Sequence, residues 1–328
     1  MSVLVLTNSE IERLLPMADC IEVMNEMFIA LARGAVHQPL RMIVQPPGAA
    51  GLMALMPAYI SGQTPAYGLK AIGVFHGNPA RGKDAHQGGV LLFSGETGEL
   101  LALMNASAIT AIRTAAVSGV ATRALAREDA STLAVIGCGI QAGTHLQAMA
   151  AVRPLKRARV ASLHIESARR FAEEMRPRFP FAIEAVGSAD QAVRGADLIV
   201  TATTAAQPVL QREWIAPGTH INAVGAYGPN KRELDTATVR ASSFFVDRRE
   251  SALNEAGDYL LASREAGFGP EHIRGELGEL LIGTARGRGS RDELTCFKSM
   301  GIAAEDLAAA QYLYRRAGQE GAGRWVDF

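Results

Sequence analysis

Hydrophobic residues follow two different periods in the first third of the chain. Between Asp19 and Arg33 they recur at the three- to four-residue spacing of a helix, and Gly34 follows where a glycine commonly ends one. The next segments, "RMIVQPPGAAGLMALMPAYI", "YGLKAIGVF" and "GGVLLFSGETGELLALM", are short apolar runs separated by Gly, Pro and Thr-Gly turns. This pattern predicts an amphipathic helix followed by a sheet with hairpin connections.

The pattern changes after "NASAITAIRTAAVSGVATRALA", an Ala- and Thr-rich segment that predicts a further helix. From there strands and helices alternate: "TLAVIG" precedes a helix that begins at about Gln141, and "ARVASL" precedes "ESARRFAEEM". The apolar runs "ADLIVTATT", "THINAV" and "SSFFVD" follow as buried strands. Such alternation predicts an α/β fold with a doubly wound parallel sheet.

The last segment with a clear period is "GIAAEDLAAAQYLYRRAG", which is amphipathic at helical spacing. We expect this helix to pack back on the first domain, with no strand after it. The length of 328 residues favours two domains. We place one at residues 1–120 with 300–328, and the parallel-sheet domain at residues 121–299.

Composition narrows the class of partner. The 33 Lys and Arg residues balance the 33 Asp and Glu residues, so no strong field favours nucleic acid or an acidic membrane surface. The opening "MSVLVLTNSEIERLLP" reaches Glu10 after an apolar run too short for a signal peptide or a membrane span. We therefore expect a cytoplasmic protein without nucleic-acid or membrane partners.

Cysteine and histidine spacing gives no metal signature. Cys20, Cys138 and Cys296 are odd in number and far apart, which suggests neither a disulfide framework nor a thiolate site. The seven histidines lack the H-x-x-x-H and H-E-x-x-H spacings of zinc sites. We expect no bound metal.

The stretch "LAVIGCGIQAGTH" joins an apolar strand to a helix through a glycine-rich turn. In the G-x-G-x-x-G/A pattern the first glycine permits the tight turn, the second admits the pyrophosphate, and the third position keeps helix and strand close. These positions are Gly137, Gly139 and Ala142. A plain strand-to-helix turn is the alternative, but the β/α units that follow favour a dinucleotide site.

The residue that would choose between the two nicotinamide cofactors gives no clean signal. An acid about 20 residues after the turn holds the ribose of NAD, whereas a nearby basic residue suits the phosphate of NADP. The second strand ends "VASLHIESARR", with Ser162 where the acid would stand. The sequence therefore predicts NAD(H) or NADP(H) without deciding between them.

Seven stretches together carry a resemblance to a known family: "LMALMPAY", "YGLKA", "TGELLALMNASAITAIRTAAVS", "VIGCGIQAGTH", "PGTHINAVGA", "REL" and "FKSMGIAAED". Through them the chain resembles the ornithine cyclodeaminase/mu-crystallin family over nearly its whole length. "AHQGGVLLF" and "FKSMGIAAED" resemble the ketimine reductase/mu-crystallin-like members in particular. The resemblance implies a Rossmann dinucleotide-binding domain, an α+β substrate-binding and dimerisation domain to which the C-terminal helix returns, and a homodimer.

The resemblance also implies a set of site residues. Arg41, Lys70 and Arg113 would face a substrate whose common feature is an α-carboxylate, which a guanidinium grips with a planar fork of donors. Lys70, in an apolar strand, would exchange a proton with the substrate nitrogen if burial lowers its pKa. A snorkelling surface lysine and an ordinary helix-surface arginine are the plainer alternatives. The residues implied to line the dinucleotide are Arg113, Thr114, Gly137, Gly139, Ile140, Gln141, Ala142, Ser162, Thr203, Val224, Gly225 and Ser299.

The sequence departs from the cyclodeaminase pattern in "NAVGAYGPNKREL". Cyclodeaminases and the alanine dehydrogenases of the family place Asp where this chain has Tyr227, and a phenol with a pKa of about 10 is no anionic partner for an ammonium group. Tyr227 would donate a hydrogen bond or shape the pocket, or its ring would simply cover the cofactor. Met53 stands where ornithine-specific members often have Glu, and His86 is a candidate pocket hydrogen-bonder or a structural histidine.

These features favour an NAD(P)H-dependent reductase of a cyclic 2-imino carboxylate, such as Δ1-pyrroline-2-carboxylate or Δ1-piperideine-2-carboxylate, that forms the L-imino acid. The alternatives are an ornithine cyclodeaminase, an alanine dehydrogenase-like enzyme and a non-catalytic mu-crystallin-like binding protein. Retention of Arg41, Lys70 and Arg113 argues against the binding protein, because a scaffold has no use for a carboxylate-gripping set.

Overall fold

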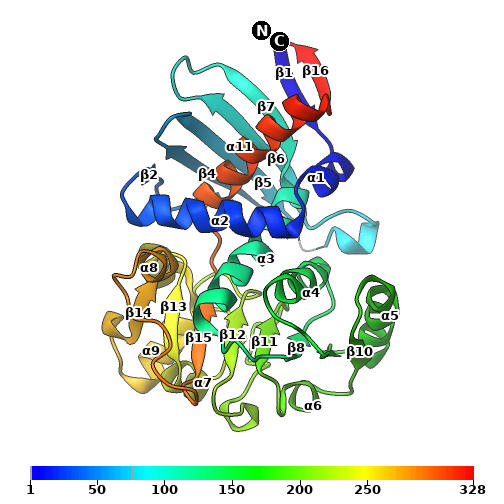
Figure 1. Ribbon diagram of the computed structural model, residues 1–328, viewed down its shortest axis with the longest axis vertical. Helices are drawn as coiled ribbons and strands as arrows, with labels where there is room; N and C mark the ends of the chain where they lie inside the picture. Colours follow the sequence, from blue (N-terminus) through cyan, green and yellow to red (C-terminus); the bar gives the residue numbers. More distant parts are fainter. Residues whose placement is uncertain (1, 76) are drawn as a thin grey trace. The chain divides into compact units, whose positions relative to one another are not determined.

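The computed structural model describes residues 2–75 and 77–328, and the chain divides into two compact units. The first unit combines Met1–Thr114 with Gly301–Phe328, and the second is Ala115–Met300. Both ends of the chain therefore belong to the first unit (Figure 1).

An eight-stranded sheet forms the base of the first unit. Its strands, in spatial order, are β16 (Arg324–Asp327), β1 (Ser2–Leu6), β7 (Leu100–Asn105), β6 (His86–Ser94), β5 (Ala66–Val74), β4 (Leu52–Ile60) and β2 (Val36–His37), with β3 (Met42–Val44) paired to β4. Strands β4 to β7 pair antiparallel, as the hairpin pattern predicts. The helical elements are α1 (Asn8–Leu14), α2 (Met17–Ala32), η1 (Pro79–Arg81), α11 (Ala303–Glu320) and α3 (Ala106–Leu125), which continues into the second unit.

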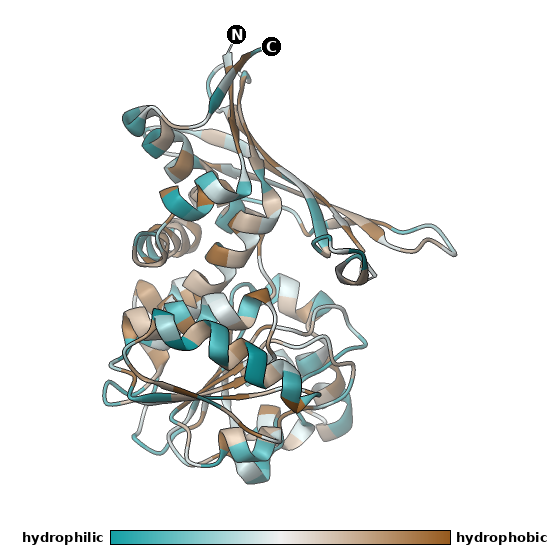
Figure 2. Cartoon of the chain, turned by 90° about the vertical axis from the view of Figure 1, so that its right-hand side faces the viewer, coloured by the Kyte–Doolittle hydropathy of each residue, from teal (hydrophilic) through white to brown (hydrophobic). Residues whose placement is uncertain are grey.

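One face of this sheet is covered by helices (Figures 1 and 2). In β5 every even-numbered residue from Ala66 to Val74 is buried, whereas the odd-numbered residues are partly or fully exposed. Helix α11 packs across β4, β5 and β6, and α2 packs against α11. The approach is close at Gly68, where a Cβ atom would lie 2.9 Å from Cδ1 of Leu307. The expected return of the C-terminal helix to the first part of the chain is thus observed.

The expectation that no strand follows this helix is wrong. Residues Arg324–Asp327 form β16, which pairs antiparallel with β1. The pairing runs from Ser2 opposite Asp327 to Val5 opposite Arg324. All four residues of β16 are exposed. An edge strand held by backbone hydrogen bonds needs no buried side chains, so it shows none of the alternation from which strands are predicted.

The second unit contains an eight-stranded sheet in which all neighbouring strands run parallel. In spatial order the strands are β10 (Ala182–Ala185), β9 (Arg157–Ala161), β8 (Thr132–Ile136), β11 (Leu198–Thr201), β12 (His220–Ala223), β15 (Thr295–Lys298), β13 (Ser243–Val246) and β14 (Ile273–Glu276). The helical elements are α4 (Ile140–Val152), α5 (Ile165–Met175), η2 (Arg176–Arg178), α6 (Ala189–Val193), η3 (Arg212–Trp214), α7 (Thr236–Ala241), α8 (Arg249–Glu255), α9 (Gly257–Ala266), η4 (Pro270–His272) and α10 (Leu277–Leu281).

The order of these strands creates a switch point beside β8. The chain runs from β8 to β9 and β10 in one direction, and then crosses to β11 on the other side of β8. In an open α/β sheet, ligands bind outside the carboxyl ends of the strands at such a reversal. The fold is therefore the Rossmann-like doubly wound sheet that the alternation predicts, together with a second α/β unit.

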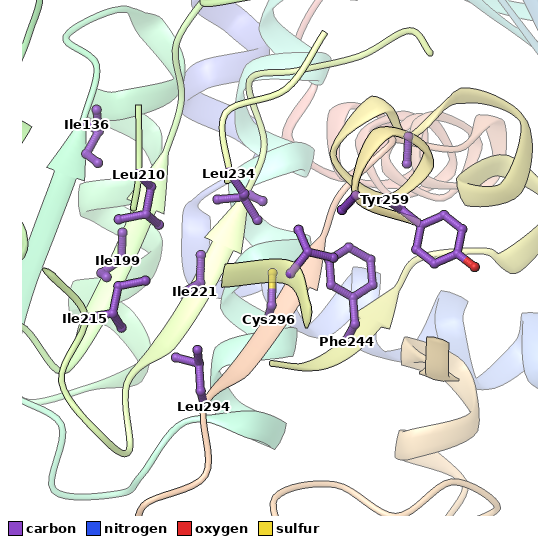
Figure 3. Packing of buried hydrophobic residues seen from close by; sticks show 14 of the residues in the cluster. Ile136, Ile199, Leu210, Ile215, Ile221, Leu234, Phe244, Tyr259, Leu294 and Cys296 are labelled. Carbon is purple, nitrogen blue, oxygen red and sulfur yellow. The ribbon is translucent and has the colours of Figure 1, made fainter. Parts of the chain in front are cut away.

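The inner strands β11, β12, β13 and β15 of the second unit are buried on both faces of the sheet, and one of these faces carries a hydrophobic cluster. Ile199, Ile221, Phe244 and Cys296 are fully buried and belong to one hydrophobic cluster (Figure 3). Parallel strands covered by helices read as continuous apolar runs, which explains why "LIVT" and "SFFV" were recognisable in the sequence.

Candidate functional site

Strand β5 carries a buried lysine. The alternation of β5 directs Lys70 to the face covered by α11, where only 2% of the residue is exposed. Its ammonium nitrogen Nζ lies 3.1 Å from Oδ1 and 3.3 Å from Oδ2 of Asp306, in the first turn of α11. A charge with so little access to water requires such a partner. The structure therefore excludes the surface-lysine interpretation of Lys70.

Helix α3 brings a buried arginine to the same carboxylates. Nε of Arg113 donates to Oδ1 of Asp306 at 3.1 Å, and Nη1 donates to Oε2 of Glu305. Arg113 is only 4% exposed, and the two acidic side chains are at most 1% exposed. The N-terminus of α11 adds its positive dipole end to the cations that hold these carboxylates. Arg113 is thus no helix-surface charge.

A third cation meets the segment that leads into α11. Nη2 of half-buried Arg41 donates to the carbonyl oxygen of Gly301 at 2.8 Å. Gly301 has a φ of +70°, and a Cβ there would lie 2.6 Å from Nη1 of Arg113. The structure therefore brings Arg41, Lys70 and Arg113 together around Gly301–Asp306. We call these three residues the cation set.

Burial and the neighbouring carboxylates shift the pKa values of the two buried cations in opposite directions. Burial lowers the pKa of Lys70 to about 8, although the carboxylate of Asp306 raises it; the positive charges of Arg113 and Arg41 lower it further. For Arg113, burial alone would lower the pKa, but Asp306 and Glu305 together raise it. Lys70 is consequently the member of the cation set that can exchange a proton near neutral pH.

Two further predicted substrate residues lie at different places on the sheet. Met53 is 49% exposed and lies on the face opposite to Lys70, because Met56 is the residue of β4 that pairs with Lys70. The structure does not group Met53 with the cation set. His86, at the start of β6, is half-buried and lies on the face of Lys70, further along the sheet.

In the second unit the glycine-rich turn lies between β8 and α4. Gly137 has a φ of +119°, and a Cβ there would lie 2.4 Å from the carbonyl oxygen of Ala202. Gly139 caps α4 and faces open space, since no atom lies within 4 Å of the place of a Cβ. Ala142 is fully buried at the helix–strand contact. Each position meets the requirement that the dinucleotide pattern sets for it, so these residues fit a pyrophosphate.

The end of β9 contributes no carboxylate to this region. Ser162 is half-buried and accepts a hydrogen bond from Sγ of Cys138 at 3.3 Å. The next residue, Leu163, is 92% exposed, and Ile140 at the start of α4 is 63% exposed. Exposed apolar side chains beside the glycine turn suit the flat faces of a bound nucleotide.

The loops after β11 and β12 carry three of the other predicted cofactor residues. Thr203 follows β11, and Val224 and Gly225 follow β12, all half-buried at the carboxyl edge of the sheet. Ser299 follows β15, and its backbone N–H donates to the carbonyl oxygen of Ala223 at 3.1 Å. The structure thus places these residues along one edge.

The remaining predicted residues are Gln141, Thr114 and Tyr227. Gln141 is half-buried in the first turn of α4, and Thr114 is buried in α3. Tyr227 is half-buried and packs against the hydrophobic cluster of the second unit, with Nζ of Lys231 5.8 Å from its ring centre. The ring of Tyr227 therefore has a packing role in its own unit.

Sequence reasoning missed the acidic residues of the site. Glu305 and Asp306 lie within the motif "FKSMGIAAED" and Glu233 lies within "REL", but the sequence alone predicts no role for any of them. For the first two, the only local signal is that adjacent acids in the first turn of an Ala-rich helix complement the positive end of the helix dipole, which indicates a helix N-terminus and not a site. For Glu233 no local pattern distinguishes it from a solvated turn residue.

Within residues 2–75 and 77–328, no group of His, Cys, Asp and Glu side chains is arranged to hold a metal ion. In the same ranges no helix is long and apolar enough to cross a membrane.

Comparison with known sequences gives a match over almost the whole chain. Residues 1–321 match the family model of the ornithine cyclodeaminase/mu-crystallin family. A Δ1-pyrroline-2-carboxylate reductase of Bacillus cereus is 40% identical over 275 residues, which cover 84% of each chain. The ketimine reductase mu-crystallin of Mus musculus is 38% identical over 281 residues, 86% of this chain and 85% of the mouse protein.

Two solved structures share the fold over nearly the whole chain. The Δ1-pyrroline-2-carboxylate reductase of Thermococcus litoralis, in complex with NADH and L-proline, has a TM-score of 0.95 at 39% identity and covers 98% of this chain and 99% of its own. An archaeal alanine dehydrogenase dimer with bound NAD has a TM-score of 0.93 at 33% identity, with both chains fully covered.

Proposed function

The chain belongs to the ornithine cyclodeaminase/mu-crystallin family, and from this premise we propose that it is an NAD(P)H-dependent reductase of cyclic 2-imino carboxylates. Δ1-Pyrroline-2-carboxylate and Δ1-piperideine-2-carboxylate are the substrates proposed, with the L-imino acid as product. The observation that carries the proposal is the buried cation set of the first unit, in which Lys70 has a pKa of about 8 beside two guanidinium groups.

The cation set supplies what imine reduction requires from the protein. Arg41 and Arg113 bind the substrate carboxylate, which orients the carbon that accepts the hydride. Lys70 donates a proton at the imine nitrogen, or keeps that nitrogen protonated, because its ammonium form is present up to about pH 8. One proton and one hydride added across the C=N bond give the saturated ring.

The second unit binds the cofactor. Gly137, Gly139 and Ala142 hold the pyrophosphate at the N-terminus of α4, whose thirteen residues give a full dipole. When bound, the reduced nicotinamide supplies the hydride. The absence of a carboxylate at residues 162–164 is compatible with both NADH and NADPH.

Tyr227 separates this reaction from cyclodeamination. Removal of an amino group needs an anionic partner for the substrate ammonium, and a phenol packed on an apolar cluster is no such partner. An imine substrate already contains the C=N bond, so the missing carboxylate does not prevent its reduction.

The direct test follows oxidation of NADH and of NADPH with each of the two imines and the purified protein. We expect turnover with at least one combination, and no oxidation of either cofactor would end the proposal. Release of ammonia from L-ornithine with catalytic NAD would instead identify a cyclodeaminase. Pyruvate reduction that depends on added ammonia would identify an alanine dehydrogenase-like enzyme.

Substitution of Lys70 by Met distinguishes an enzyme from a binding protein. The variant keeps the length of the side chain but has no proton to donate, so we expect turnover to fall by roughly 10²-fold or more. A binding protein would keep its ligand affinity and have no turnover to lose. If the Lys70→Met protein reduces imines at the parent rate, the role assigned to Lys70 is wrong.

The open face of the first unit's sheet supports a homodimer. Met53, Tyr67 and Leu103 are 49%, 52% and 42% exposed on the face that α11 does not cover. Leu91 pairs with both Leu69 and Leu103, so apolar side chains cross neighbouring strands on this face. A continuous exposed apolar face of this kind marks an interface, and we assign it to a second copy of the chain.

Light scattering coupled to size-exclusion chromatography measures the assembly. We expect a dimer for the parent protein and a monomer for Leu103→Glu, because the new charge would be buried without a partner. Ala151→Glu, on an exposed position of α4, is the matched control and should leave the mass unchanged. A Leu103→Glu protein that remains dimeric would assign the interface to another surface.

A further inference from the structure

Glu233 is a fully buried carboxylate on which five hydrogen bonds converge. Its Oε2 accepts from Oγ1 of Thr201 at 2.8 Å and from the backbone N–H groups of Gly225 at 2.7 Å and Ala226 at 3.3 Å. Its Oε1 accepts from the backbone N–H and from Oγ1 of Thr203, both at 2.7 Å. The carboxylate thus joins the ends of β11 and β12 to each other.

The loops are packed so closely around this carboxylate that one of their residues must be glycine. A Cβ at Gly225 would lie 2.2 Å from the carbonyl oxygen of Thr203 and 2.6 Å from Oε1 of Glu233. Any side chain at Gly225 would push the two loops apart or displace the carboxylate. The spacing of the loops and the position of Glu233 therefore depend on each other.

A second acid and a lysine hold Glu233 in place. Oδ1 of buried Asp258 accepts from the backbone N–H groups of Glu233 at 2.7 Å and Leu234 at 2.9 Å. Oδ2 of Asp258 forms an ion pair of 2.9 Å with Nζ of Lys298, which donates to the carbonyl oxygen of Ala226 at 2.6 Å. The network thereby extends to the end of β15.

These three strands end where the second half of a dinucleotide lies. The phosphates are bound at the turn after β8, and the cofactor crosses the carboxyl ends of the neighbouring strands from there. In the spatial order of the sheet, β11, β12 and β15 follow β8 one after another on the side away from β9. The loops that Glu233 joins carry Thr203 and Gly225, and the loop after β12 continues to Tyr227.

We propose that Glu233 is a positioning residue for the nicotinamide end of the cofactor, acting through the loops after β11 and β12. Glu233 has no exposed surface, so the role that we assign to it is exerted through the loops that it joins. The proposal rests on the proposed function in one respect, namely that these loops hold a nicotinamide cofactor.

The test compares Glu233→Gln with the parent protein by titration with NADH and NADPH, followed through nicotinamide fluorescence, without any imine. The amide of Gln would point N–H groups at the Thr and backbone donors that now bind a carboxylate oxygen, so we expect the Kd for the cofactor to rise about tenfold. Glu293→Gln is the matched control. Glu293 also accepts from two backbone N–H groups, those of Gly289 and Ser290, but it precedes β15 at the opposite edge of the sheet, and its variant should bind normally.

A double-mutant cycle separates positioning from general destabilisation. Thr201→Val removes one donor to the carboxylate, and we expect the double variant Glu233→Gln/Thr201→Val to bind the cofactor no more weakly than Glu233→Gln alone, since both changes act on the same contact. Partial unfolding would reduce the fraction of protein that binds without changing its Kd. Glu233→Asp, which keeps the charge, should regain part of the affinity.

An unchanged Kd in Glu233→Gln would overturn the inference, as would a parent protein that binds neither cofactor. A parent protein that binds NADH but reduces no imine would refute the proposed substrate alone. In that case the Kd of the Glu233 variants would still decide the role of Glu233.

Discussion

Asp306 provides the sharpest test of the chemistry assigned to the first unit. Its carboxylate lies 3.1 Å from Nζ of Lys70, and it raises the pKa that burial otherwise lowers. In Asp306→Asn the shape of the side chain is kept and the negative charge is lost. Arg113 and Arg41 remain, and both lower the pKa of Lys70. We therefore expect the pKa of Lys70 to fall well below about 8.

The geometry sets the size of this fall. At about 3 Å and an effective dielectric constant of about 20, two unit charges attract by about 5 kcal/mol, equivalent to about 4 pKa units. This value is an upper limit, because Asp306 also binds Arg113. Carboxylates at such distances shift a neighbour by about 1–3 units, which puts the pKa of Lys70 in the variant between about 5 and 7.

The sign follows from the role of Lys70 as proton donor. Only the protonated form is active, so kcat/KM should decline as the pH rises through the pKa of Lys70. For the parent protein the decline is expected near pH 8. For a variant whose pKa has fallen by two units, about one molecule in a hundred is active at pH 8, roughly fiftyfold fewer than in the parent.

The assay is kcat/KM for Δ1-pyrroline-2-carboxylate measured across the pH range, with circular dichroism to verify folding at each pH. The titration of the imine itself is common to both proteins and cancels in the comparison. Asp19→Asn is the control, since Asp19 binds Tyr312 and Arg316 in the same unit and is not among the charges that shift the pKa of Lys70. An alkaline decline at the same pH in Asp306→Asn and the parent would refute the reasoning.

Three further predictions concern the second unit. Gly137→Ala should lower the melting temperature and weaken NADH binding, because Gly137 has a φ of +119° and no room for a Cβ. Gly139→Ala should weaken NADH binding alone, since its Cβ would occupy only the open space that suits the pyrophosphate. Calorimetry measures the melting temperature and fluorescence titration measures NADH binding, so the two effects are separable. Arg153→Met should lower the free energy of unfolding in urea by about 1–3 kcal/mol, because the guanidinium binds four carbonyl oxygens at the end of α3. An unchanged urea midpoint would show that these hydrogen bonds do not stabilise the fold. Burial lowers the pKa of His145 to about 4 from 6.5, so between these pH values the unfolded chain binds a proton that the folded chain does not. The free energy of unfolding should therefore fall by up to roughly 3 kcal/mol as the pH drops through this interval, and His145→Gln should remove most of this pH dependence.

Local pattern predicted those parts of the fold in which side chains decide the structure. The helix that begins at Met17 and the parallel strands were recognisable because apolar residues repeat with the period of the element or form buried runs. The glycine turn was recognisable because Gly137 and Gly139 stand at fixed distances from a strand and a helix. The sequence does not predict strand β16, because all four of its residues are exposed and show no alternation of apolar and polar positions.

The candidate site divides in the same way. Arg41, Lys70 and Arg113 were singled out through family motifs, and the structure brings them to one segment. Their acidic partners were missed, since Lys70 and Asp306 are 236 residues apart in the chain. A cation in an apolar segment indicates that some anion must be near it, but the sequence does not say which of 33 acidic residues it is.

The partners matter because they set the net charge that the substrate meets. Arg41, Lys70 and Arg113 carry three positive charges, and Glu305 and Asp306 carry two negative ones around the same segment. One positive charge is left over, which a single carboxylate neutralises; a second carboxylate would be buried without a partner in the first unit. Cations alone would suggest a site for strongly anionic substrates. With Glu305 and Asp306 included, the same residues favour a monocarboxylate, as the cyclic imino acids are.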